Sequence, residues 1–160
     1  MSAVCEASVR DIGAAALARF CSDVQIEYRI PGHRLRVDLR ATLPNGHWAL
    51  VECKPFDQTV TPYVDAVDQA ASYADAIEYP VFIGPVYGSP LELSLGRHDN
   101  GLGTLHLMAG RLNVGFLWIN ERDEAGLLLR GQNIIDTRRG LHSNFDNVWR
   151  YKRRSGSGVR

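Results

Sequence analysis

Three residues of this chain combine the types and spacing needed for chemistry on a phosphate group. Glu52 and Lys54 stand two positions apart after the apolar run 47–51, and Asp38 precedes Glu52 by fourteen positions. In an extended strand, residues two apart project to the same side, roughly 6.6 Å from each other. Carboxylate oxygens are ligands that hard cations take from proteins, and an ammonium group stabilises charge on a bound phosphate. The three side chains therefore predict a divalent-cation site, provided that the fold brings them together.

A β-hairpin must position these residues. Residues 47–54 alternate between two faces, so Glu52 and Lys54 share one of them. The preceding strand, 35–43, alternates in the same way, with Asp38 on one face and the apolar side chains on the other: Leu35, Val37, Leu39 and Ala41. Whether Asp38 faces Glu52 depends on the register, because a slip of one residue sends every side chain to the opposite face.

Two loop lengths are plausible for this hairpin. A two-residue loop of Pro44 and Asn45 would place Asp38 across from Val51 and leave the two acids on different sides. A three-residue loop of residues 44–46 sets Asp38 directly across from Glu52. The shorter loop needs a positive φ at Pro44, which the proline ring forbids, whereas the longer one suits Pro, Asn and a left-handed Gly. We therefore predict the three-residue loop.

Two carboxylates that face each other across antiparallel strands repel unless a positive group lies between them. Mg²⁺, with Mn²⁺ as a substitute, is the predicted cofactor, held by Asp38 and Glu52 and by the backbone carbonyl of Cys53. Lys54 is predicted either to take a proton from the attacking water or to stabilise charge that builds on the phosphate.

The combination of Asp38 with Glu52-x-Lys54 on a following strand resembles the motif of the PD-(D/E)xK nuclease superfamily. The resemblance covers residues 3–120 and departs from the family pattern at Val37, where the motif has proline. It implies the restriction-endonuclease-like fold: an α/β core in the order αβββαβαβ, with a mixed five-stranded sheet flanked by helices. It also implies Mg²⁺-dependent hydrolysis of DNA, double-stranded or branched, that leaves a 5′ phosphate.

The first helix is expected at residues 3–21, where apolar residues recur with helical spacing. In many relatives an acid from this helix joins the metal site, and the resemblance makes Glu6 the candidate, with Asp11 as a weaker rival. Glu6 and Arg10 also have the i,i+4 spacing of an ordinary surface ion pair, so both alternatives stay open.

A second helix is predicted at residues 63–77, with Gln69 and Tyr73 as i,i+4 neighbours. They face small residues on a side that is not plainly solvent, so the amide needs hydrogen-bond partners. The pair resembles the Gln-x-x-x-Tyr motif of the exonuclease-like branch of the superfamily. We predict that Gln69 positions the nucleophile and that Tyr73 contacts nucleic acid; simple packing against nearby backbone is the alternative.

The rest of the chain completes a single domain. Strands are expected at 25–30, 80–86 and 113–120, a third helix at 102–112, and an edge hairpin at 127–130 and 134–137. The 45 % hydrophobic and 22 % charged residues are typical of a globular protein, and no apolar stretch approaches a membrane span. We expect a cytoplasmic location. The three cysteines have no metal-binding spacing, nor do the five histidines.

The formal net charge of zero hides an uneven distribution. Residues 1–137, the predicted nuclease-like domain, hold eleven Lys or Arg and seventeen Asp or Glu, whereas residues 138–160 hold seven and one. We predict that this basic extension binds phosphates; a solvated tail without such a role is the alternative. The predicted nucleic-acid contacts come from the second helix, the first strand of the hairpin and the extension. They are Tyr73, Arg36, Arg40, Arg150, Lys152, Arg153 and Arg154.

The sequence thus predicts a magnesium-dependent deoxyribonuclease, an endonuclease that can form a homodimer to cut two strands. The alternative is a nuclease-fold module that binds nucleic acid or a protein partner without catalysis. A module without turnover has no reason to keep opposed carboxylates at an energetic cost, which favours the enzyme.

Overall fold

The computed structural model describes residues 6–54, 61–88, 90, 93, 101–138 and 140–141. Its helices are α1 (Glu6–Leu17), α2 (Thr61–Ile77) and α4 (Leu102–Gly110). Its strands are β1 (Ser22–Arg29), β2 (Arg36–Thr42), β3 (Trp48–Cys53), β4 (Val81–Tyr87), β5 (Val114–Ile119), β6 (Ala125–Leu129), β7 (Gln132–Asp136) and β8 (Gly140–Leu141).

Within these ranges, eight strands form one sheet in the chain order β1 to β8. The pairs β1–β2 and β2–β3 are antiparallel, β3–β4 and β4–β5 are parallel, and the pairs from β5 to β8 are antiparallel again. Parallel neighbours need a crossover connection, and α2 and α4 lie in the two crossovers. The protein is therefore α/β with a mixed sheet.

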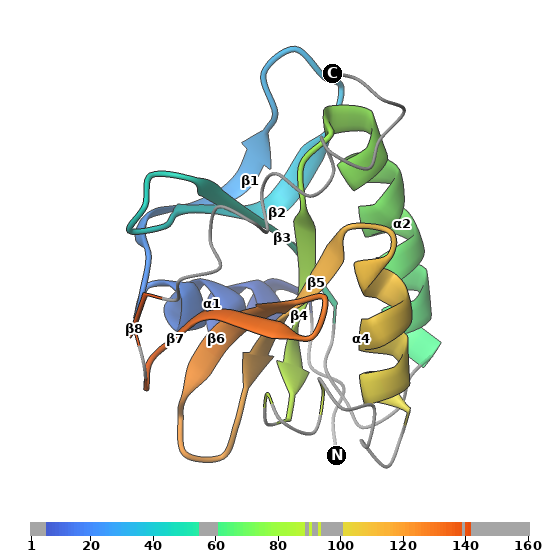
Figure 1. Ribbon diagram of the computed structural model, residues 1–160. Helices are drawn as coiled ribbons and strands as arrows, with labels where there is room; N and C mark the ends of the chain where they lie inside the picture. The colour runs from blue at the N-terminus through green and yellow to red at the C-terminus, as the bar shows by residue number, and fades with distance from the viewer. Residues whose placement is uncertain are drawn as a thin grey trace.

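Helices cover both faces of this sheet (Figure 1). On one face, Val9, Ala16 and Leu17 of α1 pack into a core with side chains of β2 and β3. On the other face, α2 and α4 cover β4 and β5, where Phe116 and Trp118 are fully buried. Each such large apolar side chain contributes roughly 1.5–3 kcal/mol when it is fully buried.

The α/β class, the mixed sheet and the flanking helices are as predicted, but the sheet is larger than the five strands expected. The predicted edge hairpin is present as β6 and β7, and β8 was not predicted. The sheet grows because residues 125–136 form two short, largely buried strands that continue the antiparallel pairing from β5. It also continues past residue 137, since β8 pairs with β7.

The register of the β2–β3 hairpin is the predicted one. Leu39 pairs with Val51 and Thr42 pairs with Trp48, which is the register that sets residue 38 across from residue 52. The acids therefore approach each other from neighbouring strands.

The turn of this hairpin has the three-residue form. Leu43 N donates to His47 O at 2.8 Å, Gly46 N donates to Leu43 O at 2.8 Å, and Gly46 has a φ of +87°. A left-handed glycine at the third loop position is what the turn requires after Pro44.

The predicted alternation of β2 is wrong at one point, because it is not kept through Asp38. Leu39 packs beneath α1, but Val37, which was predicted to share its face, packs with Leu50 in a cluster that lies beneath α2. The residue of β1 opposite Asp38 is Glu27, whose φ of +56° departs from strand geometry. Such irregularities re-aim the side chains around them and are frequent beside active sites.

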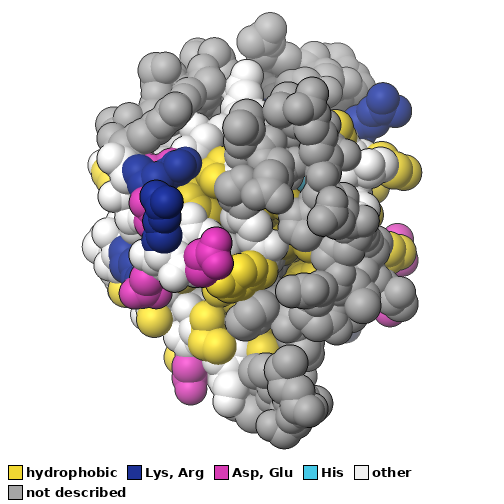
Figure 2. Space-filling view, turned by 90° about the horizontal axis from the view of Figure 1, so that it is seen from below, with side chains coloured by type: hydrophobic (Ala, Val, Ile, Leu, Met, Phe, Trp, Pro, Cys, Tyr) yellow, Lys and Arg dark blue, Asp and Glu magenta, His cyan; other side chains and the backbone are white. Residues whose placement is uncertain are grey.

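The described helices include none that is long and apolar enough to span a membrane. Figure 2 views the molecule from below, the side away from the β1–β2 loop at the top of Figure 1. There, acidic and basic side chains lie close together, with hydrophobic ones beside them. The part of this face that the structure describes therefore shows no extended basic surface.

Candidate active site

Asp38 and Glu52 meet where β2 and β3 separate. The backbone ladder between the two strands ends at Leu39 and Val51. Beyond it, Asp38 N donates to Glu52 Oε2 at 3.0 Å, and Cys53 N donates to Asp38 Oδ2 at 2.7 Å. Carboxylate oxygens thus replace backbone carbonyls as acceptors, and these bonds hold both acids on rigid strands rather than on a loop.

Glu52 lies in an environment that disfavours its charge. It is 4 % exposed. Burial, followed by the negative charge of Asp38, raises the pKa of Glu52 from 4.5 to about 8, and hydrogen bonding with the Asp38 side chain adds to the rise. The Asp38 amide and the Lys54 charge act in the opposite direction. Near neutral pH Glu52 therefore keeps its proton when no other cation is bound.

A surface pocket of about 640 Å³ contains both acids. Lys54 lines it directly after β3, and Gln69 and Tyr73 line it from α2. The fold therefore brings together the four residues predicted to be catalytic, Asp38, Glu52, Lys54 and Gln69, and places Tyr73 beside them.

Gln69 and Tyr73 contact each other directly. Gln69 Nε2 donates to the Tyr73 hydroxyl at 3.1 Å. Gln69 is exposed, contrary to the expectation of a shielded amide, whereas Tyr73 is half-buried and packs against the cluster of Val37 and Leu50. The pair follows the helical spacing of α2, in which Ala70 and its neighbours bring the helix close to the sheet.

The pocket also contains four charged residues that the sequence analysis did not assign to the site. Arg10 comes from α1 and forms an ion pair with Glu27, at 3.4 Å between Nη1 and Oε2. Arg29 and Arg34 join the predicted Arg36 around the β1–β2 turn. Arg29, Arg34 and Arg36 could have been found from the sequence, because all three lie close to Pro31-Gly32. Nothing in the sequence pairs Arg10 with Glu27.

Arg40 is not part of the pocket, although the sequence analysis assigned it to nucleic acid. Its side chain is buried, lies 4.7 Å from the ring centres of both Tyr28 and Trp48, and forms an ion pair with Asp23 at 2.5 Å. A buried guanidinium held in this way is unavailable to a phosphate, so we exclude Arg40 from the proposed surface.

Some predicted site residues lie outside the described residues. The Glu6 side chain belongs to this group, although Glu6 begins α1, and so do the four basic residues of the extension, Arg150, Lys152, Arg153 and Arg154. Cys53 is described, and its amide donates to Asp38. The predicted role of its carbonyl stays a prediction.

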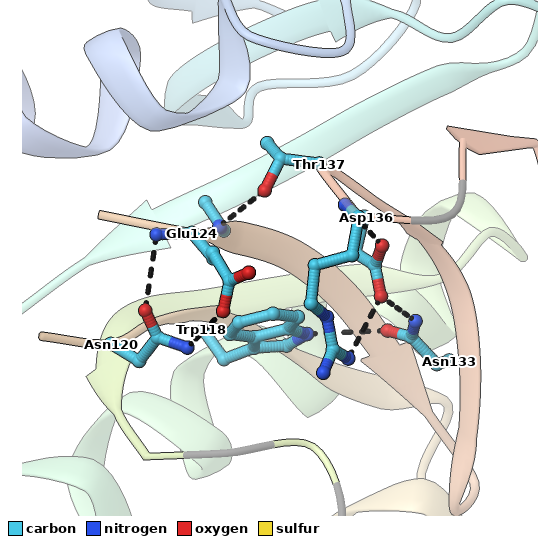
Figure 3. Close-up of polar contacts among 8 residues, drawn as sticks. Trp118, Asn120, Glu124, Asn133, Asp136 and Thr137 are labelled. Atoms are coloured by element: carbon cyan, nitrogen blue, oxygen red, sulfur yellow. Dashed lines mark hydrogen bonds and ion pairs between the residues drawn. The ribbon is translucent and has the colours of Figure 1, made fainter. Parts of the chain in front are cut away.

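A second polar cluster lies on β5 and β7 (Figure 3), and its residues are not among those that line the pocket. Trp118 Nε1 donates to Asn133 Oδ1 at 3.2 Å, and Asn133 Nδ2 donates to the buried Asp136 at 2.5 Å. Arg138 binds Asp136 through its amide at 2.7 Å and its guanidinium at 3.0 Å, and it lies over the Trp118 ring. The cluster joins the start of the predicted extension to the sheet, which is a structural role.

One described histidine, His106, and the two described cysteines, Cys21 and Cys53, are buried or half-buried. His106 is fully buried against Phe116, its Nε2 accepts from Gly131 N at 3.1 Å, and burial lowers its pKa to about 4. Cys53 is buried, and burial raises the pKa of the Cys21 thiol to about 12. Neither thiol is suited to act as a nucleophile near neutral pH.

Among the described residues, no group of three or more His, Cys, Asp or Glu side chains is arranged to hold a metal ion. A proposed metal site therefore rests on two ligands, the carboxylates of Asp38 and Glu52.

No protein-family model matches the chain, and no curated protein matches it either.

Proposed function

We propose that this protein is a metal-dependent nuclease that hydrolyses DNA phosphodiester bonds in the pocket around Asp38, Glu52 and Lys54. The observation that carries the proposal is the meeting of these three side chains in one pocket. Carboxylates and an ammonium group at the same point are the components of metal-assisted phosphoryl hydrolysis. The surrounding arginines supply the positive charge that a polyanionic substrate requires.

The residues present fit a divalent cation. Glu52 and Asp38 are close enough for hydrogen bonding between their side chains to affect the pKa of Glu52. A buried carboxyl group that keeps its proton at neutral pH, beside a second carboxylate, is a place where a cation can replace that proton. Mg²⁺ is commonly held by one or two carboxylates together with waters and substrate phosphate, which this pair provides for. Mn²⁺ is the expected substitute.

When bound, such an ion would lower the pKa of a water molecule and neutralise charge on the phosphate. In hydrolysis, the water oxygen forms a bond to phosphorus while the bond to the 3′ oxygen breaks, and the 3′ oxygen takes up a proton. Asp38 and Glu52 would hold the ion, and Gln69 would orient the water. Lys54 stabilises the developing phosphate charge as an ammonium, or takes the water proton as a neutral amine.

The finer assignment, to the PD-(D/E)xK superfamily and its restriction-endonuclease-like fold, is part of the same proposal. It is supported by the order of α1, β1–β3, α2, β4, α4 and β5 and by the Asp38 and Glu52-x-Lys54 positions on paired strands. From this assignment follow DNA as the substrate, endonucleolytic cleavage and a 5′ phosphate on the product.

The test is cleavage of supercoiled plasmid and of linear, branched and single-stranded DNA, with RNA alongside, in Mg²⁺, Mn²⁺ or EDTA. We expect the wild type to cut DNA only with a metal ion, and Lys54→Ala and Asp38→Asn to be slower by about 100-fold or more. Lys54→Arg keeps the charge but cannot act as a base, so partial activity would assign Lys54 an electrostatic role.

Arg111→Ala removes an exposed positive charge that does not line the pocket, and it serves as the matched control. Circular dichroism and thermal unfolding verify that each variant is folded. Cutting that persists both in EDTA and in Lys54→Ala would rule out this site. Binding of DNA without any cutting would instead favour a binding module.

A further inference from the structure

Three arginines of the β1–β2 hairpin, Arg29, Arg34 and Arg36, stand together on the pocket wall. Arg29 ends β1, Arg36 begins β2, and the two are paired directly across the strands. Arg34 lies two positions before Arg36, and all three are exposed and line the pocket. We refer to these three residues as the hairpin arginines. Their loop lies at the top of the view in Figure 1.

None of the hairpin arginines forms a salt bridge with another described residue. Like charges directly opposite each other on paired strands destabilise the pairing. The salt bridges found between described residues include none of the three, while Arg10 in the same pocket is already paired with Glu27. An anion placed between the hairpin arginines would therefore relieve repulsion that the free protein contains.

Phosphate is the anion that fits this arrangement. A guanidinium group presents planar donors that match two phosphate oxygens, which an ammonium group does not. Arg36 and Asp38 are two residues apart on β2, roughly 6.6 Å along the strand. A phosphate at the arginines and a second phosphate at the acid pair would thus be separated on the scale of neighbouring phosphates in one nucleic-acid strand.

We propose that the hairpin arginines anchor a phosphate next to the one that is cleaved, so that the substrate is an oligonucleotide strand with phosphates at both points rather than a mononucleotide. This inference rests on the proposed function, since the acid pair defines which phosphate is cleaved. The anchor sets substrate affinity and the minimum substrate length. The hairpin arginines do not touch the reacting bond.

The experiment compares the wild type with the Arg29→Ala/Arg36→Ala double variant. Binding of a fluorescent single-stranded DNA oligomer is measured in EDTA over a range of salt concentrations, and cleavage of the same oligomer and of shorter ones is then measured with Mg²⁺. The double variant should bind the oligomer about tenfold or more weakly. Its plot of log Kd against log salt should be less steep by about 0.7 for each phosphate that the arginines no longer neutralise. KM should rise while kcat changes little.

Arg111→Ala/Arg122→Ala is the matched control, because it removes two exposed arginines that do not line the pocket. If the hairpin variant and this control bind and cleave alike, the anchor is wrong and the nuclease proposal stands. If the wild type cleaves nothing, while the hairpin variant binds more weakly than the wild type and the control, the nuclease proposal fails. The hairpin arginines would then be a phosphate-binding site without an adjacent cleavage site, which overturns the anchor as proposed. Equal affinity of the wild type for a mononucleotide and for the oligomer would also overturn the anchor.

Discussion

Asp38 and Glu52 each use one carboxylate oxygen to bind a backbone amide of the opposite strand. These bonds fix where the two carboxyl groups point before any cation arrives. A cation that replaces the proton of Glu52 would therefore find its ligands in place, at little cost in side-chain entropy. The protonation state of Glu52 then determines whether the site can bind a cation.

Metal binding should depend on pH through Glu52. Because its pKa is raised to about 8, the ion must displace a proton at neutral pH. The apparent affinity for Mn²⁺ should therefore rise about tenfold per pH unit below pH 8 and level off above it. Calorimetric titration between pH 6 and pH 9 measures this, and the same affinity at every pH would contradict it.

The same shift has a consequence for the metal-free protein. A carboxyl group whose pKa is raised on folding stabilises the protein below its unfolded pKa, near 4.5, and this stabilisation is lost as pH rises through about 8. In EDTA the free energy of unfolding should fall by a few kcal/mol across this window, on the order set by the pKa shift. Glu52→Gln should remove the fall, and the exposed Glu121→Gln should not.

At the scale of elements, α1 supports the acid pair through a close approach at Gly13. A Cβ at this position would lie 3.0 Å from Leu39 Cδ1 and 3.4 Å from Cys53 Sγ. Leu39 and Cys53 directly follow Asp38 and Glu52 in the sequence. The missing side chain therefore lets the helix pack against the two strands that hold the site.

Gly13→Leu should push α1 away from the sheet and lower the free energy of unfolding by about 1–3 kcal/mol, as overpacked cores do. Gly13→Ala should be nearly neutral, because a gain of about 1 kcal/mol in helix propensity offsets the tight contact. Urea denaturation measures both. Ala15→Leu adds similar bulk on an exposed position of α1 and should leave stability within about 0.5 kcal/mol. Equal effects of the two leucines would exclude the close-approach explanation.

At the scale of the whole molecule, two sets of basic residues are proposed to bind the substrate. One set is the arginines that line the pocket. The other is the predicted extension, in which seven Lys or Arg residues outnumber one acid. Both sets of basic residues are proposed to contact phosphate, and among the described residues the pocket arginines line the same pocket as the acids. Substrate affinity and substrate cleavage should therefore be separable.

A chain that ends after Leu141 tests this separation, because it keeps β8 and removes five basic residues and one acid. We expect weaker DNA binding, with a salt dependence that is less steep by about 0.9 for each duplex phosphate no longer contacted. The cleavage rate at saturating DNA should be unchanged. A full-length variant with Arg150, Lys152, Arg153 and Arg154 changed to Gln controls for chain length. Unaltered binding in both would identify the extension as a solvated tail.

Local chemistry explains which features could be predicted. Pro44 excludes one of two loop lengths, and this choice determines the register that sets Asp38 across from Glu52. Helical spacing likewise indicated α2 and the contact between Gln69 and Tyr73. The last strand of the sheet, β8, was not predicted, because a strand of two residues has no periodicity to detect.

The sequence by itself determined the α/β class, the hairpin and the meeting of the acid pair with Lys54, because these depend on residues close together in the chain. Only the tertiary structure decided that Arg40 is buried between Tyr28 and Trp48 while Arg29 and Arg34 reach the pocket. The arginines look alike in the sequence. Burial and ion pairing depend on segments that are distant in the chain, and alternation along one strand carries no information about those neighbours.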